Sequence, residues 1–377
     1  MAKLLLDNGE IFEGKSIGYE GTAFGEICFN TSMTGYQEIL TDPSYAEQVI
    51  VMTYPEIGNY GINKDDFESS KVHATGFVIK NYCEKESHYL SSIKLNEYLK
   101  QKKVVAITGV DTRKLTTIIR ETGAMNCVIT SGDEITEELR SGLKNYSMDK
   151  DIAQIVSRKS KEIIKSKAKN KKIKIAVIDC GIKKSILDNL IKQGCTLTVY
   201  PADVSAKEIL KEKFNAVLIS NGPGDPADAV KTIQTVKELI GKIPLYGICL
   251  GYQILSIALG AKTYKLKYGH RGGNHPVINK LTNKVMMTSQ NHGYAVDVDT
   301  LPKNASATYV NLNDGTLEGF ICPELQIEAV QFHPEASPGP YDACEIFDEW
   351  VAQIKQDRQD KKFFGLIKKI GGKNAKK

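Results

Sequence analysis

Residues 243–260 read Ile-Pro-Leu-Tyr-Gly-Ile-Cys-Leu-Gly-Tyr-Gln-Ile-Leu-Ser-Ile-Ala-Leu-Gly, with the cysteine at position 249. A short apolar run leads into Cys249, and apolar residues then recur at helical spacing. This pattern predicts a strand, a sharp turn and a helix, with Gly247 and Gly251 leaving room at the turn. The same layout with serine is the nucleophile elbow, whose strained backbone presents the nucleophile at a helix N-terminus. Because the helix dipole favours a thiolate there, the pattern predicts a nucleophile rather than a buried core thiol.

The length and composition are those of an ordinary globular protein. A chain of 377 residues is too long for one compact core, so we expect two domains. Hydrophobic residues make up 41% and charged residues 25%, and no apolar run approaches the length of a membrane span. The N-terminus is not typical of a signal peptide. Eight cysteines form no Cys-x-x-Cys pair, so we expect reduced thiols, no zinc and a cytoplasmic location.

The basic charge is concentrated in two segments. Residues 158–174 and 361–377 carry net charges of +8 and +7, which leaves −10 for the rest of a chain whose total is +5. Like-charged runs repel and resist packing. We therefore predict a solvated lysine-rich linker at residues 157–172 and a basic tail at 361–377, rather than a nucleic-acid-binding surface. The linker separates an N-terminal domain, residues 1–150, from a C-terminal domain, residues 173–360.

The C-terminal domain alternates two kinds of pattern. The predicted strands are residues 174–179, 196–200, 216–220 and 243–248, and the predicted helices are residues 185–193, 205–213 and 227–240. Such alternation predicts an α/β fold with a doubly wound, mostly parallel sheet flanked by helices. The N-terminal domain is predicted to be mixed α and β, with a hairpin turn at residues 7–9 and a helix over 111–121.

The loop Asn-Gly-Pro-Gly-Asp-Pro at residues 221–226 follows one predicted strand, and Cys249 follows another. Ligands of parallel sheets bind beyond the carboxyl ends of the strands, so we expect the loop and Cys249 to share one site. The backbone N–H groups of Gly222, Gly224 and Leu250 could there donate to an oxyanion. By its composition alone, the loop is equally compatible with a surface turn.

His333 is the candidate base for a cysteine nucleophile. It follows the apolar run 327–330, and Glu335 stands two residues further on. A base that is oriented by a carboxylate is the general logic of a catalytic triad. Alone, this pattern fits a surface histidine beside an unrelated acid, but together with the cysteine elbow it predicts a triad. The prediction requires an exposed Cys249 sulfur within reach of the His333 imidazole.

The other histidines give weaker signals. His292 lies in the polar cluster 290–294 and has no acid at a useful spacing, so we interpret this segment as the lining of a substrate pocket. His270 and His275 are five residues apart and lack a paired carboxylate, so no metal is predicted. The chain contains no phosphate-binding loop and no dinucleotide fingerprint, so nothing in it predicts ATP binding.

Three segments together resemble the class I glutamine amidotransferases: residues 246–253, 220–226 and 332–335. The N-terminal domain narrows the resemblance to the small subunit of carbamoyl phosphate synthase. The segments that carry it are residues 29–45 (Phe-Asn-Thr-Ser-Met-Thr-Gly-Tyr-Gln-Glu-Ile-Leu-Thr-Asp-Pro-Ser-Tyr), 53–61, 110–116, 269–276 and 335–340. The resemblance spans residue 1 to about residue 356.

The resemblance implies roles for particular residues. Cys249 would attack the side-chain amide of glutamine and form a thioester, His333 would move the protons, and Glu335 would orient His333. The residues implied to hold glutamine are Ser44, Gly222, Gly224, Leu250, Gln253, Asn291, Gly293 and Tyr294. Tyr252 and Tyr294 depart mildly from the family pattern, where histidine and phenylalanine are frequent. No cofactor is implied for this chain.

The resemblance also implies a partner. This is a large synthetase subunit that carries ATP with Mg or Mn and joins ammonia to bicarbonate, in a heterodimer or an oligomer of heterodimers that serves arginine or pyrimidine biosynthesis. No nucleic acid or membrane partner is expected. A glutaminase for another synthetase is the alternative, although residues 1–150 argue against it. A non-catalytic regulatory subunit would predict a missing triad member, and a cysteine peptidase would need a specificity signal that we do not find.

Overall fold

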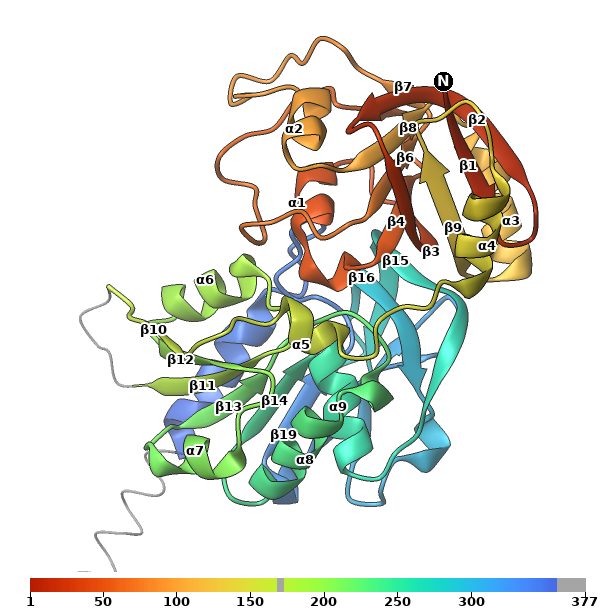
Figure 1. Cartoon of the computed structure of the whole chain (residues 1–377). Coiled ribbons are helices and arrows are strands. Elements are labelled where there is room, and N and C mark those ends of the chain that lie inside the picture. Colours follow the sequence, from red (N-terminus) through yellow and green to blue (C-terminus); the bar gives the residue numbers. More distant parts are fainter. Residues whose placement is uncertain (168–172, 358–377) are drawn as a thin grey trace, which may run out of the picture.

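The computed structural model describes residues 1–167 and 173–357, so the predicted tail at 361–377 lies outside the described residues. Figure 1 shows two bodies, with the N-terminal domain above the C-terminal domain. The upper body is built on a closed barrel, and the lower body is built on a ten-stranded sheet.

The N-terminal barrel has the strand order β1-β2-β8-β6-β4-β3-β9. Its strands are β1 (Ala2–Leu6), β2 (Ile11–Gly18), β3 (Thr22–Asn30), β4 (Gln48–Met52), β6 (Gly76–Ile79), β8 (Val105–Thr108) and β9 (Met125–Thr130). Also in this domain are β5 (Glu56–Ile57), β7 (Asn81–Tyr82), α1 (Tyr36–Thr41), α2 (Leu95–Gln101), α3 (Thr112–Thr122) and α4 (Glu137–Asn145). The next helix, α5 (Ile152–Val156), packs on the C-terminal body through Ala153 (Figure 1). β1 and β2 form the predicted hairpin. The predicted helix begins after Asp111, whose carboxylate accepts the Lys114 N–H at 2.9 Å, and ends at Gly123.

The C-terminal sheet has the order β10-β12-β11-β13-β14-β19-β18-β17-β15-β16. Its strands are β10 (Glu162–Ile164), β11 (Lys174–Asp179), β12 (Thr196–Pro201), β13 (Ala216–Ile219), β14 (Leu245–Ile248), β15 (Thr263–Asn279), β16 (Val285–Val296), β17 (Ser306–Asn311), β18 (Leu317–Cys322) and β19 (Ile327–Val330). The five strands from β12 to β19 are parallel, which confirms the predicted α/β class. The strands from β18 to β16, and β10 at the other edge, pair antiparallel and were not predicted.

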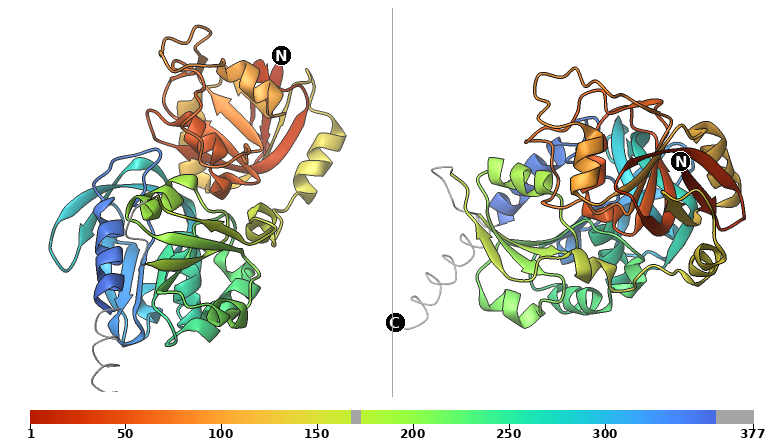
Figure 2. Two further views of the ribbon diagram at one scale, coloured as in Figure 1. Left: turned by 90° about the vertical axis from the view of Figure 1, so that its left-hand side faces the viewer. Right: turned by 45° about the horizontal axis from the view of Figure 1, so that its top comes forward.

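Helices cover both faces of the parallel strands (Figure 2). One buried cluster joins the sheet to α6 (Lys184–Lys192) and to the helical segment 345–357. A second cluster joins the opposite face to α7 (Ala206–Lys211), α8 (Val230–Leu239) and α9 (Leu250–Ala258). The helix predicted from residue 227 begins later, because residues 226–228 form a 3₁₀ turn capped by the Asp225 side chain. This two-layer covering is why the parallel strands are apolar on both faces.

The lysine-rich linker differs from its prediction. β10 lies within it and pairs with β12, so the expectation that the linker resists packing is wrong for residues 162–164. Two of its basic side chains pair with acids: Arg158 contacts both Asp179, at 2.8 Å, and Glu162, at 2.6 Å, and Lys161 contacts Glu212. Residues 168–172 of the linker lie outside the described residues.

The two domains are in close contact. A Cβ at Gly35 of the N-terminal domain would lie 2.1 Å from the Pro338 Cβ of the C-terminal domain. The Glu68 carboxylate accepts hydrogen bonds from the Ser185 N–H at 3.1 Å and from the Ser185 hydroxyl at 2.6 Å. No helix within the described ranges is both long and apolar enough to cross a membrane.

Candidate active site

Cys249 stands between β14 and α9, in the predicted strand–turn–helix. Its backbone has φ 53° and ψ −106°, a conformation that a non-glycine residue rarely adopts. A Cβ at Gly251 would lie 2.1 Å from the Ile219 carbonyl oxygen, and one at Gly247 would lie 2.7 Å from the Gly251 backbone. The turn therefore requires both glycines, and the cysteine is held at the N-terminus of α9.

Three neighbouring parallel strands bring the predicted groups to one edge of the sheet. β13 leads into the 221–226 loop, β14 leads into Cys249, and β19 leads toward His333. The Cys249 N–H donates to the Val330 carbonyl oxygen at 2.9 Å, which fixes β14 against β19 at the turn. The sheet thus places the cysteine, the loop and the histidine together, as the strand-end rule predicts.

A buried chain of charged groups lies behind the histidine. The Glu335 Oε1 lies 2.7 Å from His333 Nδ1 and accepts from Lys183 Nζ at 2.9 Å. Lys183 Nζ also donates to the Ala336 carbonyl oxygen at 2.5 Å. All three side chains are at most 2% exposed. The His333 Nε2 has no hydrogen-bond partner among the described residues, so it is free to exchange a proton.

The electrostatics favour a charged histidine. Burial alone would lower the pKa of His333, but the Glu335 charge and the Cys249 sulfur outweigh it and raise that pKa to about 10. Burial alone would raise the pKa of Glu335, but the Lys183 and His333 charges outweigh it and lower that pKa to about 2. At neutral pH the pair is therefore an imidazolium beside a carboxylate.

Cys249 lines a cavity of about 250 Å³ at the domain boundary. The residue is only 1% exposed, and its Sγ lies 3.6 Å from the Asn291 carbonyl oxygen. The expectation of an exposed sulfur is therefore wrong, because the site closes over the turn and leaves the cavity as the approach. A thiol buried in this way is shielded from bulk water.

Most of the predicted glutamine contacts line the same cavity. Besides Cys249, these are Ser44, Gly222, Gly224, Gln253, Asn291, Gly293 and Tyr294. Leu250, His333 and Glu335 do not line it, although Leu250 supplies the first backbone N–H of α9. His292 also lines the cavity, consistent with our interpretation of residues 290–294.

Sequence reasoning assigned no role to three residues of this site: Asn221, Asp42 and Lys183. Asn221 donates from Nδ2 to the Ser44 hydroxyl at 2.9 Å, and Asn291 donates to Asp42 at 3.1 Å. Asp42 also accepts the Ser44 N–H at 2.9 Å, so the Asp42–Ser44 turn is fixed against the C-terminal domain. Lys183 follows β11 at the same sheet edge, so the strand-end rule could have found it. Asp42 belongs to the other domain, and no sequence signal connects it to the site.

Comparisons with known proteins cover nearly the whole chain. The family model for the carbamoyl-phosphate synthase small chain, CPSase domain, matches residues 4–129, and the class-I glutamine amidotransferase model matches residues 176–353. The carbamoyl phosphate synthase small chain of Clostridium perfringens is 48% identical over 93% of this chain and 98% of its own length. The chain belongs to the carbamoyl phosphate synthase small chain family. The Methanococcus vannielii small chain is 46% identical over 95% and 99% of the two lengths, and the pyrimidine-specific small chain of Bacillus subtilis is 44% identical over 95% and 97%.

Membership of this family confirms the predicted resemblance and the class of activity. A carbamoyl phosphate synthase small chain with a glutamine amidotransferase domain is the glutamine-hydrolysing subunit of that synthase, and a small chain implies a large-chain partner. Tyr252, which departs from the family pattern, is fully buried, and its hydroxyl donates to the Leu317 carbonyl oxygen at 3.1 Å. Its role in this small chain is therefore structural.

Proposed function

We propose that this small chain hydrolyses glutamine in the Cys249 cavity and delivers the ammonia to a large synthetase subunit. The observation that carries the proposal is that Cys249 and the hydrogen-bonded pair of His333 and Glu335 lie at one edge of the sheet. Cys249 stands on a strained turn, and His333 follows the adjacent strand with its Nδ1 fixed by Glu335. This arrangement is that of a nucleophile, a base and an orienting acid.

The chemistry proceeds in two steps. The Cys249 thiolate attacks the glutamine amide carbon to form a C–S bond, and His333 donates its proton to the nitrogen as the C–N bond breaks, which releases ammonia. Water then attacks the thioester, His333 accepts a proton from that water, and the C–S bond breaks to give glutamate. Glu335 holds the imidazole through Nδ1, so that Nε2 faces the reacting atoms.

The backbone supplies the stabilisation of the oxyanion. The Leu250 N–H directly follows the nucleophile at the start of α9, and Gly222 and Gly224 bring the neighbouring loop close. Ser44, Gln253 and Asn291 hold the rest of the glutamine. The Gln253 side chain is itself fixed by hydrogen bonds to the Tyr294 carbonyl oxygen at 2.8 Å and to the Gln331 side chain at 2.9 Å.

The ammonia must then reach a second active site. In water at neutral pH ammonia is mostly ammonium and a poor nucleophile, so confinement between protein sites keeps it reactive. We place ATP, with Mg or Mn, on the large subunit, where ammonia joins bicarbonate.

The test uses the complete complex of small and large subunits. With Cys249→Ser, glutamine-dependent carbamoyl phosphate formation should fall at least about 10³-fold, because the nucleophile is lost. Synthesis from added ammonium salts should be unchanged. Cys83→Ser is the matched control, since this thiol lies in the N-terminal domain outside the cavity. Loss of both activities in Cys249→Ser would contradict the division of labour, and retention of glutamine-dependent synthesis would exclude Cys249 as the nucleophile.

A further inference from the structure

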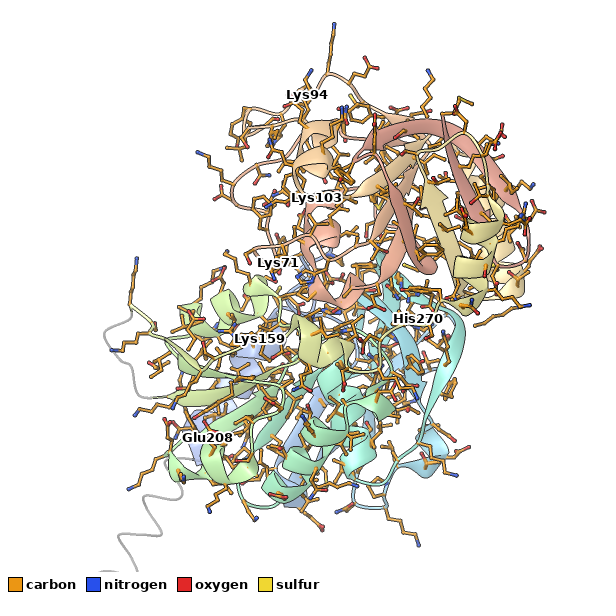
Figure 3. All side chains as sticks on the ribbon, viewed as in Figure 1. Lys71, Lys94, Lys103, Lys159, Glu208 and His270 are labelled. Atoms are coloured by element: carbon orange, nitrogen blue, oxygen red, sulfur yellow. The ribbon has the colours of Figure 1, made fainter. Side chains whose placement is uncertain are left out.

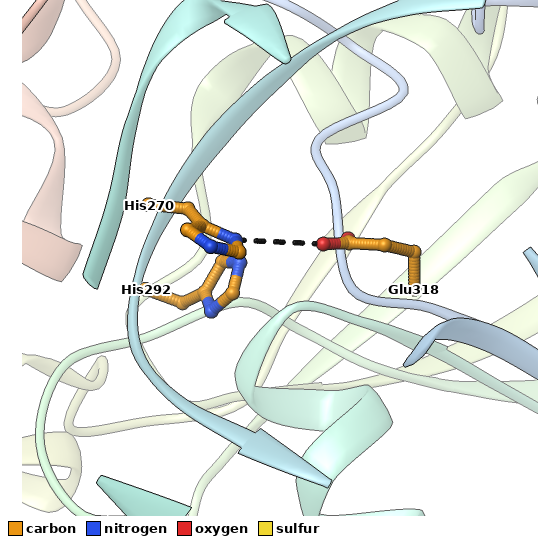
Figure 4. A group of neighbouring side chains, drawn as sticks. All are labelled: His270, His292 and Glu318. Carbon is orange, nitrogen blue, oxygen red and sulfur yellow. Dashed lines mark ion pairs between the residues drawn. The ribbon is translucent and has the colours of Figure 1, made fainter. Parts of the chain in front are cut away.

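A second cluster of titratable side chains lies beside the cavity (Figure 4). It consists of His270 on β15, His292 on β16 and Glu318 on β18, whose exposed fractions are 7%, 5% and 0%. One ligand atom from each lies within 4.8 Å of the others. Figure 3 places His270 at the end of the C-terminal domain that faces the barrel. The sequence offered no carboxylate to pair with His270, but folding supplies Glu318.

Each histidine has its second ring nitrogen fixed by an oxygen. The Nδ1 of His292 lies 2.8 Å from the Tyr294 carbonyl oxygen, which can only accept, so Nδ1 carries the proton and Nε2 keeps its lone pair. The Nε2 of His270 lies 2.8 Å from the Asp314 carboxylate, which leaves Nδ1 facing the Glu318 Oε1 at 3.5 Å. Histidine ligands of metals are held in this way, with the other ring N–H on a carbonyl or a carboxylate.

The buried carboxylate of the cluster is only partly paired, since its Oε1 accepts from Asn311 Nδ2 at 3.2 Å. The Oε2 of Glu318 has no hydrogen-bond partner among the described residues, although its side chain is fully buried. The Nε2 of His292 lies 3.1 Å from the Gln290 side-chain amide, which can rotate to offer its oxygen to a cation or its nitrogen to the imidazole lone pair. An unpaired buried acceptor is costly, and a cation among these atoms would satisfy all of them.

We propose that His270, His292 and Glu318 bind a divalent transition-metal ion of the zinc type. Ligand atoms around tetrahedral zinc lie about 3.3 Å apart, given bond lengths of about 2.0–2.2 Å. The separation of 3.5 Å between His270 Nδ1 and Glu318 Oε1 already meets this requirement, and small side-chain rotations bring in the third ligand. Gln290 Oε1 can take the fourth position. Two imidazoles favour zinc over magnesium or calcium.

The ion would act as a positioning element for the cavity wall. β16 carries His292 between Asn291 and Gly293, both of which line the cavity. An ion shared with β15 and β18 would tie these three strands together next to that wall. The metal would therefore fix the glutamine pocket without touching the reacting atoms.

A proton is the competing occupant of the same position. Burial alone would lower the pKa of His270, but Asp314 and Glu318 outweigh it and raise that pKa to about 9. A protonated Nδ1 would pair with the Glu318 Oε1, but it would leave the Glu318 Oε2 without a partner. The two occupants predict opposite results for metal content.

The test measures metal in the full chain, purified without a histidine tag. Inductively coupled plasma mass spectrometry after dialysis against zinc buffer should give about one zinc per chain, and added zinc should raise the Tm of chelator-treated protein by about 5 °C or more. Glu318→Gln and His270→Gln should abolish both effects, and Asp314→Asn should weaken zinc binding about 10–100-fold. His88→Gln, at an exposed histidine, is the control that should change neither.

The absorption spectrum of bound cobalt distinguishes a metal ion in this cluster from one bound to any of the eight free cysteines. Cobalt bound to nitrogen and oxygen ligands gives d–d bands without a thiolate charge-transfer band, and those bands should be lost in Glu318→Gln. Wild-type protein that retains no zinc, or that responds to zinc and cobalt in the same way as Glu318→Gln, would overturn the proposal and assign the cluster to a protonated His270. Neither readout depends on glutamine hydrolysis.

Discussion

Gly222→Ala tests how tightly the 221–226 loop is packed against the turn at Cys249. A Cβ at residue 222 would lie 2.1 Å from the Cys180 carbonyl oxygen and 2.8 Å from the Leu250 Cδ2. Ordinary contact begins at 3.4 Å, so the loop must move by about 1.3 Å, because the closest atom belongs to backbone. A shift of about 1 Å in a positioning group can reduce the rate about 10²-fold, and the strain should destabilise the fold by about 1–3 kcal/mol.

The assay is glutamine-dependent carbamoyl phosphate formation by the complex, with ammonium-dependent formation measured in parallel. We expect kcat/KM for glutamine to fall about 10²-fold while the ammonium-dependent rate is unchanged. Gly21→Ala is the matched control, because a Cβ there makes only ordinary contacts, with the Tyr19 ring at 3.4 Å and Val105 Cγ2 at 3.8 Å. A Gly222→Ala variant within threefold of wild type, with an unchanged Tm, would refute the reasoning.

Two further predictions concern the buried charges. Lys183→Met should destabilise the fold by about 3–5 kcal/mol, because it leaves the buried Glu335 carboxylate without its lysine. The control is Lys184→Met, which breaks only an exposed pair with Asp188 and should destabilise the fold by at most about 1 kcal/mol. Equal decreases in the free energy of unfolding of the two variants, measured by calorimetry, would contradict this prediction. Because the pKa of Glu335 is lowered from 4.5 to about 2, its stabilising contribution is present above pH 4.5 and is lost as the pH falls toward 2. Between pH 5 and pH 3 the Tm of wild type should therefore fall more steeply than that of Glu335→Gln, and parallel slopes would count against the lowered pKa.

Local sequence patterns were enough to predict the elbow and the parallel strands around it. The apolar run, the two glycines and the helical spacing near Cys249 act within about 18 residues, which is the range over which periodicity fixes a strand or a helix. The strand-end rule then placed the 221–226 loop beside the cysteine, because neighbouring parallel strands end at the same edge. The apolar run 327–330 put His333 at the end of a further strand.

The same reasoning failed to predict strands that are highly charged or irregular. β10 lies in a lysine-rich run, and it was not predicted because the acids that pair with Arg158 and Lys161 there, Asp179 and Glu212, are distant in sequence. β15 follows no clean alternation, since its pairing with β16 shifts register on both sides of the segment 270–272. The closed barrel could not be predicted from local sequence patterns either, because its closure depends on all seven strands together.

By itself the sequence was enough to predict Cys249, His333 and Glu335 as a candidate nucleophile, base and orienting carboxylate, since each lies at the end of a pattern that is readable along the chain. Only the tertiary structure decided that Lys183 contacts Glu335, that Asp42 and Ser44 reach across from the other domain, and that Glu318 meets His270 and His292. These partners are separated by between 26 and about 250 residues, and side chains so far apart are brought into contact only by the packing of sheets and domains.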